Sequence, residues 1–172
     1  MRIRKAEVKD LEEILKIYAG AREYMHSHGN PTQWPDASYP SRELLEEDIK
    51  LGRLFVVAED NDILAVYAYI IGKDPTYAVI ENGSWLNEEE YGTVHRLASS
   101  GKKGGLAPFI FDHCLTICEN LRGDTHSDNY IMQGICEDFG FKMCGIIHLL
   151  NGDPRIAYHV TRKLREEKLS SI

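Results

Sequence analysis

A glycine-rich turn between a strand-like segment and a helical pattern is the feature that most constrains how this chain can fold. Residues 94–98 read as a strand, and a helical pattern of apolar residues runs from 105 to about 121. Between them lies the segment Lys102-Lys103-Gly104-Gly105-Leu106-Ala107. Glycine allows a tight backbone turn, and the first N–H groups of a helix have no partner inside it. The pattern therefore predicts an anion-binding turn that suits a phosphate.

Composition narrows the class of protein. The chain has 172 residues, of which 43% are hydrophobic and 27% charged, as in an ordinary single globular domain. The formal net charge of −7 argues against a general nucleic-acid partner. We interpret the acidic runs Glu46-Glu47-Asp48 and Glu88-Glu89-Glu90 as solvent-exposed faces. The longest apolar run, at 63–71, is too short to span a membrane, and no apolar stretch follows the basic N-terminus as in a signal peptide.

The four cysteines predict neither a metal site nor a disulfide framework. Their spacing fits no zinc pattern and no obvious set of bridges, and two of them share one face of the 105–121 helix. Free thiols of this kind pack as small apolar residues and indicate a reducing cytoplasm. The four residues are Cys114, Cys118, Cys136 and Cys144.

Hydrophobic periodicity and turn residues predict an α+β fold with one mixed, mostly antiparallel sheet of about seven strands and about four flanking helices. Asp10 and Ser41 are expected to cap the first two helices, and Asn151-Gly152 to form the last hairpin turn. We expect a domain over 1–161 and a charged tail over 162–172 that frays. The expected strands are 2–5, 54–59, 63–71, 92–99, 122–125, 141–149 and 156–161, and the expected helices are 11–28, 42–51, 105–121 and 128–138.

This order of elements, with the glycine turn where it falls, resembles the GNAT family of N-acetyltransferases over nearly the whole chain. The family signature Gln/Arg-x-x-Gly-x-Gly/Ala is matched by residues 102–107, with lysine in the first position. Asn129 opens the next helix, and Glu137-Asp138-Phe139-Gly140-Phe141 is similar to the family's Glu-Lys-Leu-Gly-Phe helix end. The sequence lacks the phosphate-loop and dinucleotide glycine motifs that would favour other nucleotide-binding folds.

The resemblance implies acetyl-CoA as the acetyl donor. Its pyrophosphate would bind the backbone amides of Lys103, Gly104, Gly105, Leu106 and Ala107, with a charge-assisted contact from Lys102 or Lys103. The alternative for the two lysines is a solvated pair on a tight turn. The pantetheine arm would run beside the fourth strand at His95 and Leu97, where a strand N–H can stabilise the developing oxyanion. Asn129 would help to hold the arm, or would instead cap its own helix.

The catalytic groups are less clearly indicated. Cys136 occupies the position of the tyrosine that protonates the leaving thiolate in many family members, so it is either the proton donor or a packing residue; Tyr130 is a substitute donor. His95 is the preferred base because histidine titrates near neutrality, with a structural histidine as its alternative. His126 is a lesser candidate, and a water chain without a dedicated base remains open. An acetyl-cysteine intermediate at Cys136 is open but not favoured.

The expected acceptor pocket is lined by Trp34, Tyr39, Glu81 and Trp85, where each tryptophan either covers the site or anchors its loop to the core. The predicted activity is transfer of acetyl from acetyl-CoA to a primary amine of a small molecule or protein, by direct attack in a ternary complex. The rival is a non-catalytic module that binds or senses acyl-CoA, and an unrelated nucleotide-binding fold is a third alternative. Free sheet edges make a homodimer plausible, and we expect neither a nucleic-acid nor a membrane partner.

Overall fold

The computed structural model describes residues 1–171, and within them the chain forms seven strands, five α-helices and two short 3-10 helices. Hydrogen bonds order the strands β1-β2-β3-β4-β5-β7-β6. The predicted α+β class with a mixed sheet is confirmed. The strands are β1 (Arg2–Lys5), β2 (Leu54–Glu59), β3 (Asp62–Ile71), β4 (Gly92–Ser99), β5 (Asn120–Thr125), β6 (Lys142–His148) and β7 (Pro154–Thr161), and the helices are η1 (Val8–Asp10), α1 (Leu11–Ser27), α2 (Arg42–Lys50), η2 (Pro75–Tyr77), α3 (Leu106–Ile117), α4 (Tyr130–Phe139) and α5 (Arg162–Ser170).

Contacts group the chain into two compact units, which we describe in turn. Unit 1 comprises Met1–Ile70 and Val94–Ile110, and unit 2 comprises the described residues of Ile71–Thr93 and Phe111–Ile172. Both β4 and α3 therefore begin in one unit and end in the other. None of the helices in the described part of the chain is long and apolar enough to cross a membrane.

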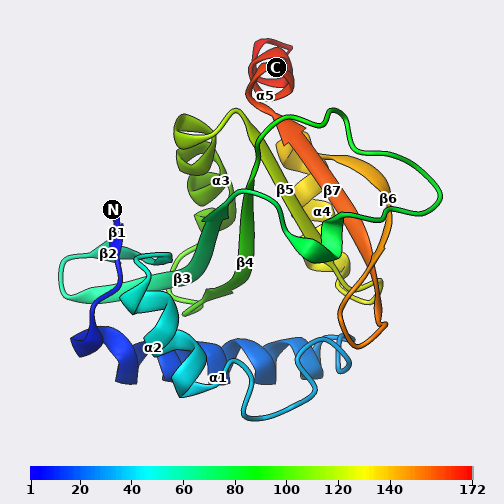
Figure 1. The fold of residues 1–172 in the computed structure, drawn as a ribbon. Helices are drawn as coiled ribbons and strands as arrows, with labels where there is room; N and C mark the ends of the chain where they lie inside the picture. The colour runs from blue at the N-terminus through cyan, green and yellow to red at the C-terminus, as the bar shows by residue number, and fades with distance from the viewer. Residues whose placement is uncertain (172) are drawn as a thin grey trace. The chain divides into compact units, whose positions relative to one another are not determined.

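Unit 1 is built on an antiparallel pairing of β1, β2 and β3, with Val56 opposite Val66 in the β2–β3 pair. Helices α1 and α2 lie side by side (Figure 1). The apolar face of α1 is the one that its helical spacing predicts, because Leu11, Ile14 and Tyr18 are all buried. Ser41 caps α2 as predicted, since its hydroxyl accepts a hydrogen bond from the Leu44 amide at 3.2 Å.

Two acidic residues of unit 1 differ from expectation. Asp10 does not cap α1 with its side chain, because its carboxylate accepts two N–H bonds from Arg4 at 2.6 and 2.9 Å and one from the Glu7 amide at 2.8 Å. A bidentate, charge-assisted pair is stronger than a cap bond. Asp48, interpreted from sequence as part of a solvated face, is only 1% exposed and pairs with Arg53 and Arg96.

Unit 2 contains the parallel β4–β5 contact at Gly92 and Thr93, followed by antiparallel pairing of β5 with β7 and β7 with β6. Strand β7 lies between β5 and β6 (Figure 1). The predicted hairpin turn is confirmed, with Gly152 at φ +89° and its amide bonded to the Leu149 carbonyl at 2.8 Å. Phe111, Phe139 and Phe141 pack against one another at centroid distances of 5.2–5.6 Å.

Helix α3 ends four residues before the predicted boundary, at Ile117, and β5 begins at Asn120. Side-chain bonds close the helix early, because Cys118 Sγ and Asn120 Nδ2 both donate to the Glu90 carbonyl, at 3.5 and 3.2 Å. Leu121, expected on the apolar stripe of the helix, is buried instead in β5 opposite Val160. Ile117, expected on the same stripe, is half exposed.

The expectation that the chain frays after residue 161 is wrong for Arg162–Ser170, which form α5 at the end of β7 (Figure 1). Thr161 caps this helix by accepting the Leu164 amide at 3.2 Å. Arg162 donates to the Leu115 carbonyl, and Arg165 pairs with Asp112 while lying 3.9 Å above the ring of Phe139. The charged side chains of α5 therefore hold this helix against the rest of unit 2 instead of keeping it in solvent. Ile172, the last residue of the predicted tail, lies outside the described residues.

The long loop before β4 crosses β6 so closely that two positions require glycine. Glu81 and Ile146 exchange backbone hydrogen bonds at 2.8 and 2.9 Å. A Cβ on Gly83 would lie 1.9 Å from the Cys144 carbonyl oxygen, and one on Gly145 would lie 2.4 Å from that of Glu81. Neither obstacle can move without breaking the crossing, because both are backbone atoms.

We therefore predict that Gly83→Ala and Gly145→Ala each lower the free energy of unfolding by about 2 kcal/mol or more. Gly134→Ala, where a Cβ meets nothing within 4 Å in the interior of α4, should instead raise it by about 0.5–1 kcal/mol. Urea denaturation followed by circular dichroism measures all three. Unchanged stability in Gly83→Ala and Gly145→Ala would contradict the crossing.

His159 joins the same loop to β5 from a fully buried position. Its Nδ1 accepts the Leu86 amide at 3.2 Å, so its Nε2 carries the proton and donates to Asn120 Oδ1 at 3.1 Å. Asn87 Nδ2 donates to the same Asn120 oxygen at 2.8 Å. Burial and the nearby Arg122 guanidinium lower the pKa of His159 from 6.5 to about 4. The folded protein therefore holds this imidazole neutral.

We predict that stability falls as the pH is lowered from 6.5 to 4, because in this window the unfolded chain binds a proton at His159 that the folded chain excludes. The loss from this residue amounts to about 3 kcal/mol at most. Urea unfolding of the wild type and of His159→Asn at a series of pH values isolates it. Equal pH dependence in the two proteins would show that His159 is not the responsible group.

Candidate active site

The predicted anion-binding turn lies wholly in unit 1, between β4 and α3. Gly101 and Gly105 adopt φ values of +77° and +74°, which glycine accepts without strain. Among the described residues, none accepts a hydrogen bond from the five amides of residues 103–107. A Cβ built on Gly104 or Gly105 meets nothing within 4 Å. The turn thus combines amides without acceptors with open space beside its two glycines, which fits a phosphate group.

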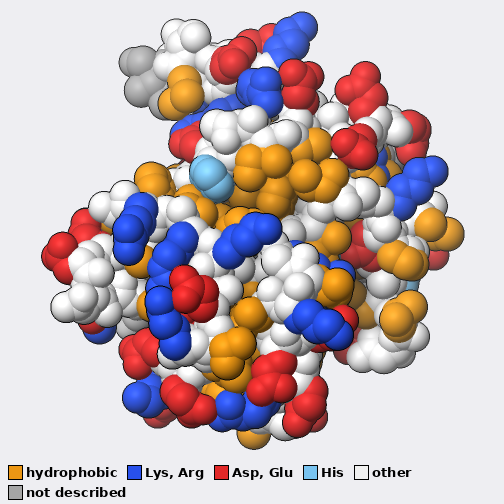
Figure 2. All heavy atoms as spheres, turned by 60° about the vertical axis from the view of Figure 1, so that its left-hand side comes forward, with side chains coloured by type: hydrophobic (Ala, Val, Ile, Leu, Met, Phe, Trp, Pro, Cys, Tyr) orange, Lys and Arg blue, Asp and Glu red, His pale blue; other side chains and the backbone are white. Residues whose placement is uncertain are grey.

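The two lysines of the turn are bound by carboxylates of the β2–β3 hairpin. Lys102 Nζ lies 2.6 Å from Asp62 Oδ1, and Lys103 Nζ lies 2.9 and 3.0 Å from the two Glu59 oxygens. These contacts raise the pKa of Lys102 and lower that of Glu59. Basic side chains also lie beside acidic ones on the face shown in Figure 2. Both pairs are exposed, and exposed ion pairs contribute little stability.

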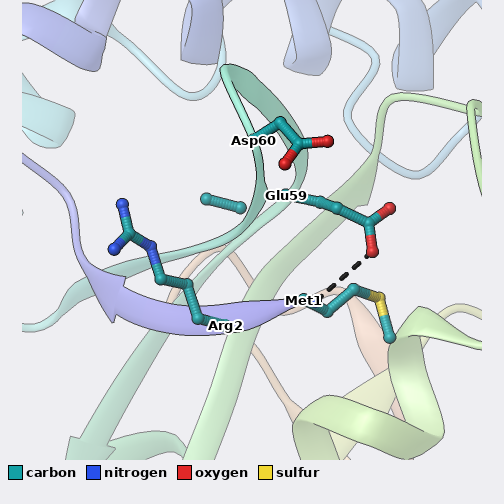
Figure 3. A pocket seen from close by; sticks show the side chains of 5 residues that line it. Met1, Arg2, Glu59 and Asp60 are labelled. Carbon is teal, nitrogen blue, oxygen red and sulfur yellow. Dashed lines mark hydrogen bonds and ion pairs between the residues drawn. The ribbon is translucent and has the colours of Figure 1, made fainter.

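A pocket adjoins this turn through Glu59. It is lined by Met1, Arg2, Ala58, Glu59 and Asp60, and Figure 3 shows Glu59 reaching the Met1 amino group, at 3.3 Å. Glu59 also binds Lys103, so the pocket and the turn share one carboxylate. The lining contains none of the residues predicted to bind cofactor or acceptor.

Strand β4 is kinked at Arg96, between the predicted site residues His95 and Leu97. Arg96 has φ +53°, a conformation that an L-residue inside a strand rarely adopts. Tyr18 donates a hydrogen bond to the Arg96 carbonyl at 2.8 Å, and the guanidinium pairs with Asp48. Burial opposes the charge of Arg96, but Asp48, Tyr39 and Tyr18 outweigh it and raise the pKa of the guanidinium. His95 and Leu97 are both half-buried.

Two of the predicted acceptor residues lie around this kink. The ring of Trp34 stands edge-on to Tyr18 at 5.7 Å and lies 6.2 Å from the ring of Tyr39. Tyr39 in turn lies close enough to the Arg96 guanidinium to help raise its pKa. Trp34 has φ +57°, a second strained non-glycine residue in the same cluster. Unit 1 therefore brings Trp34 and Tyr39 to the strand that the pantetheine arm is expected to follow.

The cofactor-binding candidate Asn129 and the catalytic candidates Tyr130 and Cys136 lie at the start of α4 or within it, in unit 2. Asn129 caps this helix, because its Oδ1 accepts a hydrogen bond from the Met132 amide at 3.1 Å. This agrees with the alternative prediction for Asn129, that it caps its own helix. Tyr130 is 73% exposed. Cys136 is buried, and burial together with Glu137 raises the pKa of its thiol to about 12. Its thiol therefore keeps its proton throughout the physiological range.

The other two predicted acceptor residues, Glu81 and Trp85, have structural roles in unit 2. Trp85 is buried and donates its indole N–H to the Tyr77 carbonyl at 3.0 Å, so it anchors its loop instead of covering a site. Arg122 lies 4.3 Å above its ring. The backbone of Glu81 makes the bridge to Ile146, and its carboxylate is exposed.

Sequence reasoning missed the polar cluster of Tyr18, Asp48, Arg53 and Arg96. A signal was present, because Asp48 follows Leu45 by three residues and so shares the buried stripe of α2. Arg96 carried no signal, since a left-handed conformation in a strand is not expected of arginine. His126, the lesser base candidate, accepts the Asp128 amide at 3.1 Å in unit 2.

All four thiols are free and buried. Within residues 1–171, no three His, Cys, Asp or Glu side chains are arranged to hold a metal ion.

Comparisons with known proteins identify the family. No protein-family model and no curated protein sequence matches the chain. Among solved structures, a GNAT-family acetyltransferase from Streptococcus agalactiae is 30% identical, with a TM-score of 0.85 over 94% of this chain and 95% of that one. A protein from Staphylococcus aureus is 25% identical, with a TM-score of 0.68 over 94% and 99%. A GNAT-family acetyltransferase from Bacillus cereus shares the fold, at 21% identity and a TM-score of 0.55 over 93% and 96%. The chain therefore belongs to the GNAT family of acetyltransferases.

Proposed function

We propose that the protein is an N-acetyltransferase that moves the acetyl group of acetyl-CoA to a primary amine. The observation that supports this most directly is the turn before α3, where five consecutive amides have no acceptor within residues 1–171 and the space beside Gly104 and Gly105 is open. A pyrophosphate is the kind of group that such a turn binds. Acetyl-CoA carries a pyrophosphate and supplies an activated acetyl group as a thioester. The amides of residues 103–107 would hold it, and Lys102 and Lys103 would exchange their carboxylate partners for phosphate oxygens.

Strand β4 would bind the pantetheine arm through its backbone at Leu97. Asn129 is a weaker candidate for this task, because its Oδ1 already caps α4. The thioester carbonyl would then accept a hydrogen bond from a β4 amide, which would stabilise negative charge on that oxygen.

The chemistry is direct attack with both substrates bound. The amine nitrogen bonds to the acetyl carbon while the carbon–sulfur bond breaks; the amine loses a proton and the sulfur gains one. We assign the base to His95, which lies on β4 next to the kink. Proton donation from Cys136 to a thiolate of ordinary pKa about 8.5 would be uphill by roughly 5 kcal/mol, so we assign Cys136 to packing. Tyr130 is exposed at the start of α4 and remains the candidate donor.

Trp34 and Tyr39 are the side chains we assign to the acceptor, because they surround the kink in β4. Glu81 could attract a cationic amine from its exposed position, whereas the buried Trp85 is not assigned to the acceptor. The four free thiols support a reducing compartment such as the cytoplasm.

A second candidate function is a non-catalytic module that senses acyl-CoA. The observation that favours it is the buried, firmly protonated thiol of Cys136 where many family members carry their proton-donating tyrosine. Release of free thiol on incubation with acetyl-CoA and a panel of amines separates the two functions. Cofactor binding without turnover on any amine would favour the sensor.

We predict that Gly105→Glu abolishes binding of acetyl-CoA, because its carboxylate would repel the phosphates from the turn. Gly105→Gln is the matched control, since it carries the same backbone strain at φ +74° without the charge. Isothermal titration calorimetry measures both. We expect Gly105→Gln to retain at least tenfold tighter binding than Gly105→Glu, and equal affinities would refute the placement of the pyrophosphate.

We also predict that His95→Gln lowers kcat by about 100-fold, because the amine loses its base. Cys136→Ala is the companion variant and should keep kcat within about threefold across pH 7–9, while losing stability through the cavity it leaves. Steady-state assays of thiol release measure both. The opposite ranking of the two variants would make Cys136 the catalytic group.

A further inference from the structure

The kink in β4 is an unfavourable conformation that the surrounding side chains maintain. Arg96 is the only non-glycine residue of the described strands that has a positive φ, at +53°. The left-handed region is unfavourable for L-residues because Cβ approaches the following carbonyl oxygen. Strain of this kind persists only where neighbouring groups fix it, and it is found most often at functional sites.

Two buried residues from two different helices hold Arg96, one by its backbone and the other by its side chain. Tyr18 of α1, 1% exposed, donates its hydroxyl to the Arg96 carbonyl at 2.8 Å. Asp48 of α2, also 1% exposed, pairs with the Arg96 guanidinium and with Arg53 Nε, the latter at 2.8 Å. The backbone and the side chain of Arg96 are thus held by separate partners. We call Tyr18, Asp48 and Arg96 the β4 clamp.

Within the β4 clamp, one hydrogen-bond donor of Arg96 has no acceptor among the described residues. This donor is the Nε of Arg96, which is buried. A buried, unpaired N–H destabilises a fold. Trp34, packed on Tyr18, has a strained backbone as well. Strain and an unpaired donor therefore concentrate at one point of β4, beside His95.

We propose that Tyr18 and Asp48 are positioning residues, which hold the kink at Arg96 so that an adjacent β4 amide points at the thioester carbonyl of the acetyl donor. This inference rests on the proposed function. A left-handed residue interrupts the alternation of a strand and turns the neighbouring peptide groups away from their regular directions. Without the clamp, β4 would relax toward a regular strand, and the amide would no longer point at the thioester carbonyl.

The first experiment tests the kink without any cofactor. Arg96→Gly and Arg96→Ala both remove the guanidinium, but only glycine adopts a positive φ freely. We expect Arg96→Gly to melt about 2–4 °C above Arg96→Ala in differential scanning fluorimetry. If the side chain alone mattered, the two would melt together or alanine would be the more stable, and either result would overturn the clamp.

The second experiment tests positioning by comparing two ligands that differ only in the acetyl group. The ratio of the dissociation constants of CoA and acetyl-CoA reports the contact with the carbonyl. We expect this ratio to fall about 3- to 10-fold in Tyr18→Phe and Asp48→Asn, with the affinity for CoA itself within about twofold of wild type. In assays, kcat should fall about 10- to 100-fold with little change in KM.

Matched controls separate positioning from loss of stability. Tyr77→Phe removes a buried tyrosine hydrogen bond to Asp124 of 2.7 Å, and Asp10→Asn removes the buried carboxylate that pairs with Arg4. Both should lower the melting temperature and leave the ligand ratio unchanged. If the clamp variants also leave the ratio unchanged, Tyr18 and Asp48 are merely structural. If the wild type binds neither CoA nor acetyl-CoA, the proposed function fails and the positioning role with it, while the glycine–alanine comparison still decides whether the clamp exists.

Discussion

The buried carboxylate of Asp48 is the interaction on which the arrangement of unit 1 depends. It bonds Arg53, just before β2, and Arg96, in the middle of β4, and it is carried by α2. One anion thus ties a helix to two segments of the sheet. A buried carboxylate stripped of its guanidinium partners would destabilise the fold by several kcal/mol, so these partners have little freedom to move. The direct consequence is a β4 strand that keeps a conformation it would not adopt alone.

Strand β4 and the turn that follows it use backbone N–H groups in two different ways. At Arg96 the backbone is bent out of its regular strand conformation, and at residues 103–107 the chain turns into α3 before its amides find partners. Unpaired amides at a helix start attract anions, because they are donors and carry the positive end of the helix dipole. The two turn lysines bind the carboxylates of the neighbouring hairpin. The same β4–α3 segment therefore contains both the proposed phosphate site and the proposed carbonyl site.

Much of this could be predicted from the sequence, since hydrophobic periodicity located nearly every strand and helix and the glycine turn pointed to the cofactor. Local patterns failed where a distant partner decided the outcome. Asp48 lay in an acidic run, but arginines on other elements made its burial favourable. The charged end of the chain became α5 because Leu115 and Asp112 offered acceptors to its arginines. Trp85 became a core residue because the carbonyl of Tyr77 accepts its N–H. No local pattern contains such information.

An amide-resolved ¹H–¹⁵N NMR titration with acetyl-CoA tests the central claim most directly, because it observes the turn N–H groups themselves. The account predicts that the amides of Lys103, Gly104, Gly105, Leu106 and Ala107 show the largest shift changes and become protected from exchange with solvent. Saturable binding that leaves these five resonances in place, while amides elsewhere move, would contradict it.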